Sequence, residues 1–513
     1  MLIFKEIQLL PEIFLGISII YLTIHGTFSS VNTKYLLIQN SILYLSVLTV
    51  ALFCYLLVNN SIEYKELQVF NNTITVDFLS FSSKVWIAFM SIFCFLMSQR
   101  YITVQKINYF EYSILILFAL LGVFFICSSN DFITAYLSIE LQSLSFYILA
   151  AAKKDSAFSV DAGLKYFILG AFSSSLFLFG SSILYGVSGT TNFEDLKNLF
   201  SLMHTHPSNI PTFENYTFVK QVFLNESLIQ FALVFIFVSL LFKLAVAPFH
   251  LWSLDVYEGS PSSSTFFFAV VPKLAIFVLF IRIFYSGFFE YVNKWRYYIV
   301  LLAILSVIVG SFGGLEQRKL KTLLAYSSIS HMGYTLIAFN TGTFEGLQTL
   351  FCYLFLYMVV GLCVWSIFLV LQLKYKYLKK QNKDLADLKS LNKSNSILAL
   401  FFSTALLSVA GLPPMIGFLV KIGIFLVSIE ASMYLVAIIS ILCSVISTFY
   451  YIRIVKIMHF ESSVAGTLYH PIRFNTSILI VCLFYFLLFL FINPTLVYLI
   501  SHKIVLLLTM TAI

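Results

Sequence analysis

Long runs of apolar residues alternate with short polar segments along the whole chain, and most of these runs have the length of a membrane span. A hydrocarbon core of about 30 Å requires roughly 20 apolar residues per helix, and counting in that unit gives about fourteen spans. The first run, Leu9 to Ile24, lacks a small-residue cleavage site, so we expect a span and not a signal peptide. The last is centred near Tyr485. The pattern predicts an all-α polytopic membrane protein.

The composition excludes a soluble domain and gives no sign of a cofactor site. Of the 513 residues, 60% are hydrophobic and only 11% are charged, whereas a soluble domain carries about 25% charged residues. The seven cysteines lie in apolar stretches without CxxC spacing, as expected for small buried hydrophobes. We find no phosphate loop, dinucleotide fingerprint or clustered Cys and His set, so we expect no cofactor and no metal on this chain.

Alternate loops differ in their content of Lys and Arg, which predicts the orientation in the membrane. By the positive-inside rule the cation-rich loops face the matrix or cytoplasm, which leaves both termini on the outer side. The opposite loops include the acidic patches Glu63 to Glu66 and Glu194 to Asp195. The cation-rich loops carry Arg100 and Lys106, Lys153 and Lys154, Arg318 to Lys321, the run from Lys374 to Lys393, and Arg453 to Arg473. We interpret the run from Lys374 to Lys393 as a solvated linker, and not as a nucleic-acid or lipid site.

Two of the expected helices are interrupted close to a lysine. Pro248 follows Lys243 by five positions, and Pro413 and Pro414 precede Lys421, so both helices lose backbone hydrogen bonds. A matched pair of interrupted helices indicates an ion path between internal repeats. We therefore predict two inverted five-helix repeats, each with one broken helix. They cover residues 110–287 and 296–460, after three helices in 1–109 and before a fourteenth in 461–513.

Ionisable residues inside the expected spans are the candidates for function. A charge at the centre of a bilayer-spanning helix costs roughly 2.5–3.5 kcal/mol, and burial makes a lysine exchange its proton more readily near neutral pH. For Lys165 an ion pair with Asp161, four residues earlier, is the alternative interpretation. The candidates for a proton relay are Glu140, Lys165, Lys243, Lys273 and Lys421.

Two histidines extend this candidate relay. The imidazoles of His250 and His331 titrate near neutrality and pass protons from either nitrogen, although a hydrogen-bonded histidine between helices is an equally good interpretation. Glu140 is expected to stay ionised beside a lysine, and the sequence leaves open which lysine that is. Hydroxyl groups able to support water chains are those of Tyr334, Tyr353, Tyr357 and Ser444, but with thirty tyrosines none is singled out.

Three segments carry a resemblance to a known family. They are Phe-Lys-Leu-Ala-Val-Ala-Pro-Phe-His-Leu-Trp from Phe242, Leu-Leu-Ala-Tyr-Ser-Ser-Ile-Ser-His-Met-Gly-Tyr from Leu323, and Gly-Leu-Pro-Pro-Met-Ile-Gly-Phe from Gly411. From about Asp131 to Ile457 the chain resembles the chain 2 family of antiporter-like membrane subunits in proton-pumping NADH:ubiquinone oxidoreductase, respiratory complex I. The sequence looks most like the mitochondrial form.

The resemblance implies a core membrane-arm subunit that translocates protons, driven by electron transfer from NADH to ubiquinone in other subunits. Those subunits are expected to hold FMN and iron-sulfur clusters, and the implied neighbours are the antiporter-like subunit 4, the small membrane-arm subunits and lipids such as cardiolipin. The implied location is the mitochondrial inner membrane, with a bacterial plasma membrane as the alternative. A stand-alone cation/proton antiporter is the rival function, but buried lysines repel the cation that it would carry.

Overall fold

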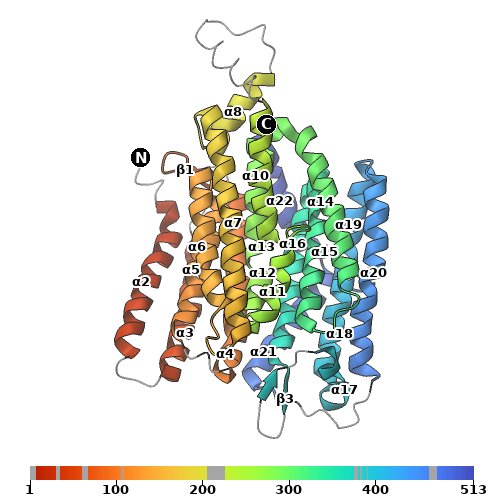
Figure 1. The fold of residues 1–513 in the computed structure, drawn as a ribbon. Helices are drawn as coiled ribbons and strands as arrows, with labels where there is room; N and C mark the ends of the chain where they lie inside the picture. Colours follow the sequence, from red (N-terminus) through yellow and green to blue (C-terminus); the bar gives the residue numbers. More distant parts are fainter. Residues whose placement is uncertain are drawn as a thin grey trace, which may run out of the picture.

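A computed structural model describes residues 7–30, 35–59, 67–105, 107, 109–204, 226–374, 379–381, 384–389, 391–461, 469 and 471–512. The acidic patch from Glu63 to Glu66, the segment 205–225 and part of the run from Lys374 to Lys393 lie outside these residues. Figure 1 shows the described elements as one bundle of long helices that run in nearly the same direction.

The helices match the expected spans closely. The long helices are α2 (Leu10–Ser30), α3 (Tyr35–Asn59), α4 (Phe78–Val104), α5 (Glu111–Ser128), α6 (Phe132–Ala150), α7 (Ala157–Ser188), α10 (Glu226–Leu244), α14 (Val292–Gly313), α15 (Leu320–Asn340), α16 (Phe344–Val370), α20 (Tyr434–His459), α21 (Phe474–Ile492) and α22 (Thr495–Ala512). The shorter ones are η1 (Ile7–Leu9), α8 (Phe193–His204), α11 (Leu251–Gly259), α12 (Ser262–Val270), α13 (Pro272–Ile281), η3 (Arg282–Gly287), η4 (Phe289–Tyr291), η5 (Leu385–Leu388), α17 (Leu391–Ser394), α18 (Ser396–Ala410) and α19 (Ile416–Glu430).

Twelve helices within the described residues are long and apolar enough to cross a membrane. The buried helix α15 and the consecutive pair α18–α19 supply two more crossings, which gives the predicted fourteen. The last crossing differs from the prediction of one continuous helix, because α21 and α22 are separate elements on either side of Asn493 and Pro494. Proline cannot continue the helix because it lacks the backbone donor.

Contacts with α4 show that α21 and α22 together make a single crossing. Near the end of α4, Arg100 donates to the carbonyl oxygen of Pro471, just before α21, at 2.8 Å. Near its start, Phe78 lies 4.7 Å from the ammonium group of Lys503 in α22. The chain therefore passes once along α4, from one end of the bundle to the other.

The cation-rich loops gather at one end of the bundle, here called the cationic end. Lys153 donates to Gln105 at 3.1 Å, and Arg453 donates to the carbonyl oxygen of Leu315 at 2.9 Å, so loops far apart in sequence meet there. Figure 1 places α17 and strand β3 (Gln372–Lys374) at this end, and the start of α2 and the end of α22 at the opposite one. The first and last described helices therefore point their outer ends to one side, as the prediction for the termini requires.

Two short β-hairpins accompany the helices, and the rest of the described fold is helical, as predicted. The strands β1 (Leu67–Val69) and β2 (Ile74–Val76) form one antiparallel hairpin, and β3 with β4 (Lys379–Gln381) forms another. The sequence analysis did not predict these two hairpins or the helix α8. The repeat boundaries at residues 110–287 and 296–460 stay a prediction.

Glycines allow two pairs of helices to pack closely. A Cβ atom on Gly122 of α5 would lie 2.7 Å from the backbone nitrogen of Gln142 in α6. A Cβ atom on Gly310 of α14 would lie 2.5 Å from the backbone nitrogen of Ser330 in α15. Small residues at such contacts let helices approach in lipid, where packing drives association. These contacts fix α6 and α15, which carry two of the candidate relay residues.

Candidate functional site

The first broken helix places Lys243 at the point where the helix ends. Helix α10 stops at Leu244, Ala245 adopts a left-handed conformation with φ of 58°, and α11 begins at Leu251. The ammonium nitrogen of Lys243 is buried, and it has no hydrogen-bond partner among the described residues. It lies 5.9 Å from the ring centroid of Tyr147. The predicted interruption is therefore confirmed, with the lysine at its edge.

Glu140 on α6 is a half-buried acid whose charge reaches Lys243. The charge of Glu140 acts on the ammonium group of Lys243, yet the two groups form no ion pair in the described part of the chain. The carboxylate instead accepts a hydrogen bond from Ser143 at 3.2 Å. The structure thus points to Lys243 as the lysine that Glu140 influences, a question that the sequence left open.

A small cavity connects Lys243 to Lys273. It is lined by Gln142, Ser143, Tyr166 and both lysines, with apolar residues around them. The space open to the centre of a water molecule is about 20 Å³, which is enough for one water. The two lysines therefore face a common polar space.

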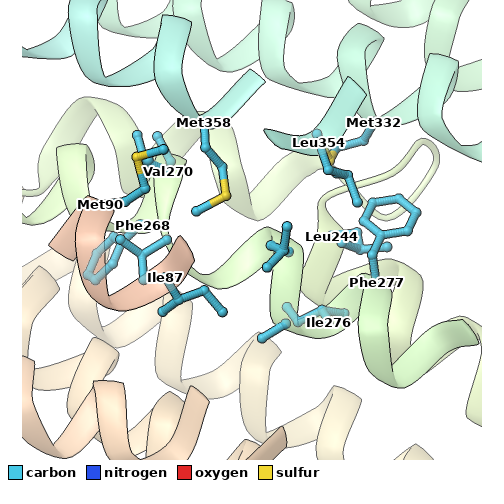
Figure 2. Close-up of a cluster of buried hydrophobic side chains, with 14 of the residues drawn as sticks. Ile87, Met90, Leu244, Phe268, Val270, Ile276, Phe277, Met332, Leu354 and Met358 are labelled. Carbon is cyan, nitrogen blue, oxygen red and sulfur yellow. The ribbon is translucent and has the colours of Figure 1, made fainter. Parts of the chain in front are cut away.

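Lys273 bridges this cavity to the second half of the molecule. It is the second residue of α13, directly after Pro272, and only 4% of its surface is exposed. Its ammonium group donates a hydrogen bond of 2.9 Å to the hydroxyl of Tyr357 on α16. Ile276 and Phe277 of α13 and Leu354 of α16 belong to one cluster of buried apolar side chains (Figure 2). The Tyr357 hydroxyl thus gives Lys273 a polar contact with the second half of the chain.

A larger cavity lies beyond Tyr357. It is lined by Tyr357, His331, Tyr353 and Lys421, and about 60 Å³ is open to water centres, enough for several waters. The Nδ1 atom of His331 forms a short hydrogen bond with the hydroxyl of Tyr353. The ring of His331 lies 5.4 Å from that of Tyr357. His331 therefore stands between the two tyrosines, within the same cavity as Lys421.

The second broken helix holds Lys421. Helix α18 ends at Ala410, Gly411 adopts a left-handed conformation with φ of 78°, and α19 begins at Ile416. The ammonium group of Lys421 donates to the carbonyl oxygen of Ala410 at 2.7 Å. A Cβ atom on Gly411 would lie 2.6 Å from Cδ of Lys421. The lysine thus caps the carbonyl end of the broken helix, and the glycine leaves room for it.

The structure brings five of the seven candidates into one series. Two cavities and the hydrogen bond from Lys273 to Tyr357 join Lys243, Lys273, Tyr357, His331 and Lys421, with Glu140 acting on the first. The six groups come from the helices α6, α10, α13, α15, α16 and α19. Such a series of buried ionisable groups, separated by spaces for water, is able to pass protons.

Lys165 does not belong to this series. Its side chain is 46% exposed and pairs with Asp161 at 3.2 Å and with Asp255 at 2.9 Å. It lines neither of the two cavities. The ion pair at four-residue spacing, which was the alternative interpretation, is present in the structure, and a role of Lys165 in proton transfer stays a prediction.

His250 lies in the first helix break, directly before α11. Its Nδ1 atom is buried and has no partner among the residues that the structure describes, and it lines neither of the two cavities. It therefore stays a candidate at the edge of the site and is not a link in the series.

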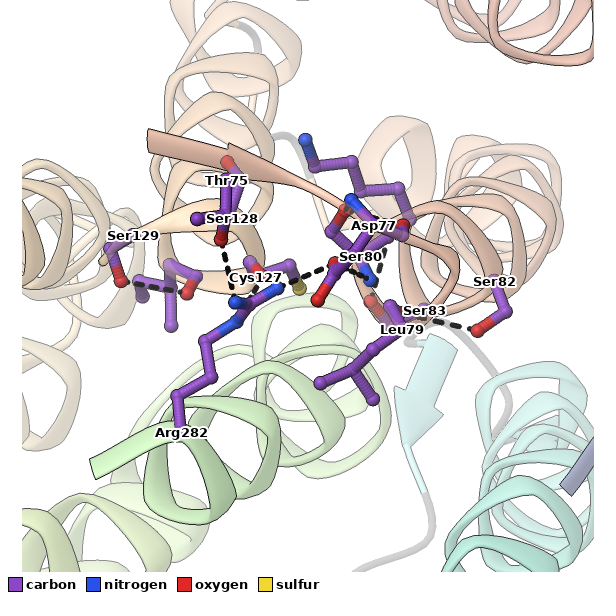
Figure 3. Close-up of polar contacts among 12 residues, drawn as sticks. Thr75, Asp77, Leu79, Ser80, Ser82, Ser83, Cys127, Ser128, Ser129 and Arg282 are labelled. Atoms are coloured by element: carbon purple, nitrogen blue, oxygen red, sulfur yellow. Dashed lines mark hydrogen bonds and ion pairs between the residues drawn. The ribbon is translucent and has the colours of Figure 1, made fainter. Parts of the chain in front are cut away.

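The sequence analysis missed two buried ion pairs. Lys84 binds Glu12 at 2.6 Å, and Arg282 binds Asp77 at 2.6 Å. Figure 3 shows the guanidinium group of Arg282 reaching toward Thr75 and Asp77 near the start of α4. Each pair joins residues more than 70 positions apart, so no local pattern in the sequence indicates it.

Comparison with known proteins identifies the family. Residues 129–447 match the model described as NADH:quinone oxidoreductase/Mrp antiporter, transmembrane. NADH-ubiquinone oxidoreductase chain 2 of Marchantia polymorpha is 39% identical over 97% of each chain. NADH-quinone oxidoreductase subunit N of Pelagibacter ubique is 38% identical over 88% of this chain and 89% of that one.

Comparison of the fold with solved structures supports the same family. A chain of respiratory complex I from Thermus thermophilus aligns with a TM-score of 0.75 and 25% identity, over 95% of this chain and 98% of that one. The antiporter-like fold and the membrane-spanning character expected from the sequence are therefore confirmed. The chain belongs to the NADH:quinone oxidoreductase/Mrp antiporter family, and within it to the group of complex I chain 2 and subunit N proteins.

Proposed function

We propose that this chain is a core membrane-arm subunit of a proton-pumping NADH:quinone oxidoreductase. In this proposal protons pass along the series from Lys243 through Lys273, Tyr357 and His331 to Lys421, and Glu140 tunes the first lysine. The observation that carries the proposal is the hydrogen bond from Lys273 to Tyr357, because Lys273 lines the first cavity and Tyr357 lines the second. Membership of the family supports the same function.

Electrostatics suggest how the protons move. Burial disfavours the charged form of each lysine, and two charged lysines facing one small cavity repel each other. Protonation of Lys243 therefore favours loss of the proton from Lys273, and an ionised Glu140 shifts that balance toward Lys243. A change of charge on one group is thus transmitted to the next, which is the behaviour of a relay.

The driving reaction belongs to other subunits. Electron transfer from NADH to ubiquinone, through FMN and iron-sulfur clusters held elsewhere, would supply the energy, and we assign no cofactor or redox step to this chain. The partners would be the other complex I subunits, including antiporter-like subunit 4 and the small membrane-arm subunits, together with lipids such as cardiolipin. The location would be the mitochondrial inner membrane, with the bacterial plasma membrane as the alternative.

A stand-alone cation/proton antiporter is the second candidate, since the family model also covers Mrp antiporters. Both cavities contain ammonium groups, from Lys243, Lys273 and Lys421, whereas sites for metal cations use carboxylate and carbonyl oxygens. The described residues contain no group of three His, Cys, Asp or Glu side chains able to hold a metal ion. The chemistry of the cavities therefore favours protons.

The experiment that tests the proposal is native separation of gently solubilised membranes. The chain should comigrate with NADH-oxidising activity in a very large assembly. Migration as a small species without that activity would contradict the proposal and favour the independent antiporter.

A further inference from the structure

A second ionisable site lies outside the series of relay residues, between the helices α2 and α4. Glu12 and Lys84 form an ion pair of 2.6 Å, and the side chain of each is only 3% exposed. A buried pair of charges costs desolvation energy that its own attraction repays only when the remaining polar atoms are also satisfied. The arrangement around the pair therefore decides whether it is stable.

Two oxygen atoms beside the pair lack partners. Oε2 of Glu12 and Oε1 of Gln8 are buried, and neither accepts a hydrogen bond from any described residue. Both residues line a cavity together with Lys84, Ser80 and Val76. About 20 Å³ of this cavity is open to the centre of a water molecule, and one water requires roughly 10–15 Å³ by that measure.

We propose that this cavity binds one water molecule, which completes a hydrated Glu12–Lys84 site. A water molecule has two donors for the two unpartnered oxygens, and it is able to accept a third bond from the ammonium group of Lys84. A sodium or potassium ion would meet that ammonium group at close range, and an anion would meet two acceptor oxygens. Water is thus the ligand whose hydrogen bonds fit all three groups.

A lid of apolar residues separates the site from the end of the bundle that carries the termini. Leu9, Val69 and Val76 are each less than 10% exposed and pack together, so the hairpin β1–β2 and the residue before α2 cover the ion pair. This cover keeps bulk water away, which strengthens the attraction within the pair. The bound water is therefore part of the folded structure.

Apolar residues also separate the site from the relay. Ile87 and Met90 are buried residues that follow Lys84 along α4, and Figure 2 shows them in a cluster with Val270 and Met358. Met358 is the neighbour of Tyr357 in sequence. The hydrated ion pair of Glu12 and Lys84 therefore stabilises the contact between α2 and α4 and takes no part in proton transfer.

The first test is a map of the intact assembly, obtained by electron cryomicroscopy at a resolution that shows waters. We expect one peak at roughly 2.6–3.2 Å from Oε2 of Glu12 and from Oε1 of Gln8. Gln8→Leu should remove the peak and leave the ion pair in place, because it deletes one of the three partners. Absence of the peak in the wild type, or protein groups bonded to both oxygens, would overturn the proposal.

The second test distinguishes a structural role of the ion pair, between α2 and α4, from a role in proton transfer. Glu12→Gln leaves the Lys84 charge unpaired, so we expect about tenfold less assembled chain, and the double variant with Lys84→Met should recover most of it. Glu111→Gln, at an exposed glutamate that begins α5, is the matched control. A Glu12→Gln variant that assembles normally but moves fewer protons per NADH would contradict the separation from the relay.

Discussion

Replacing Tyr357 by phenylalanine tests the link between the two halves of the relay with the smallest possible change. The substitution removes one oxygen atom, the acceptor of the 2.9 Å hydrogen bond from Lys273. The aromatic ring remains, so its packing against His331 at 5.4 Å is preserved. Any effect of the variant therefore reports on the hydroxyl group and not on the shape of the core.

The size of the effect follows from the burial of Lys273. A hydrogen bond to a charged group contributes about 1.5–3 kcal/mol, and at 4% exposure bulk water does not replace the lost partner. Since 1.4 kcal/mol corresponds to a factor of ten, the protonated state of Lys273 becomes roughly 10- to 100-fold less accessible. We expect proton translocation to slow by a similar factor, because the direct hydrogen bond that joins Lys273 to the second cavity is lost.

The assay is proton uptake by vesicles containing the intact complex, measured together with NADH oxidation. Tyr297→Phe is the matched control, because it makes the same chemical change at a tyrosine of α14 that is 79% exposed. A Tyr357→Phe complex that assembles fully and pumps within twofold of the wild-type rate would refute the assignment of this hydroxyl to the proton path.

Three further substitutions test the surroundings of the relay. Gly411→Ala should destabilise the assembly by about 1–2 kcal/mol, because alanine is strained at φ of 78° and its Cβ would displace Lys421; an unchanged melting temperature would contradict this. Arg282→Lys should destabilise the assembly by roughly 2–3 kcal/mol, since lysine cannot reproduce the three hydrogen bonds of Arg282, one of which is to Asp77. Thermal melting of the purified assembly measures this change. An unchanged melting midpoint would contradict a stabilising role of these three bonds. His331→Phe should stop proton translocation in the assembled complex, and vesicle uptake at the wild-type rate would exclude a role for the imidazole.

The sequence was sufficient to predict the spans and most of the relay. A lysine in an apolar run is costly wherever the run folds, so Lys243, Lys273 and Lys421 stood out without any knowledge of tertiary contacts. The prolines near Lys243 and Lys421 likewise indicated breaks that depend only on local backbone chemistry. These features are local, and for that reason the predicted spans and helix breaks were confirmed, whereas the relay role of the three lysines stays a prediction.

The features that the sequence did not predict depend on contacts between distant segments. Tyr357 differs from the other tyrosines only because Lys273, 84 residues away, reaches its hydroxyl. Lys165 was taken for a buried residue because its partner Asp255 lies 90 residues further along the chain. The Lys84 and Glu12 pair was missed for the same reason, since the partners are 72 residues apart.

The most direct test of the proposed relay compares two lysine variants of the assembled complex by the number of protons moved per NADH oxidised. Lys243→Gln removes the buried ammonium group at the first helix break, whereas Lys165→Gln removes one that is 46% exposed and paired at the surface of this chain. We predict that Lys243→Gln lowers the ratio, while Lys165→Gln, which removes only an exposed ion pair, leaves it unchanged. An unchanged ratio in a fully assembled Lys243→Gln complex would contradict the account.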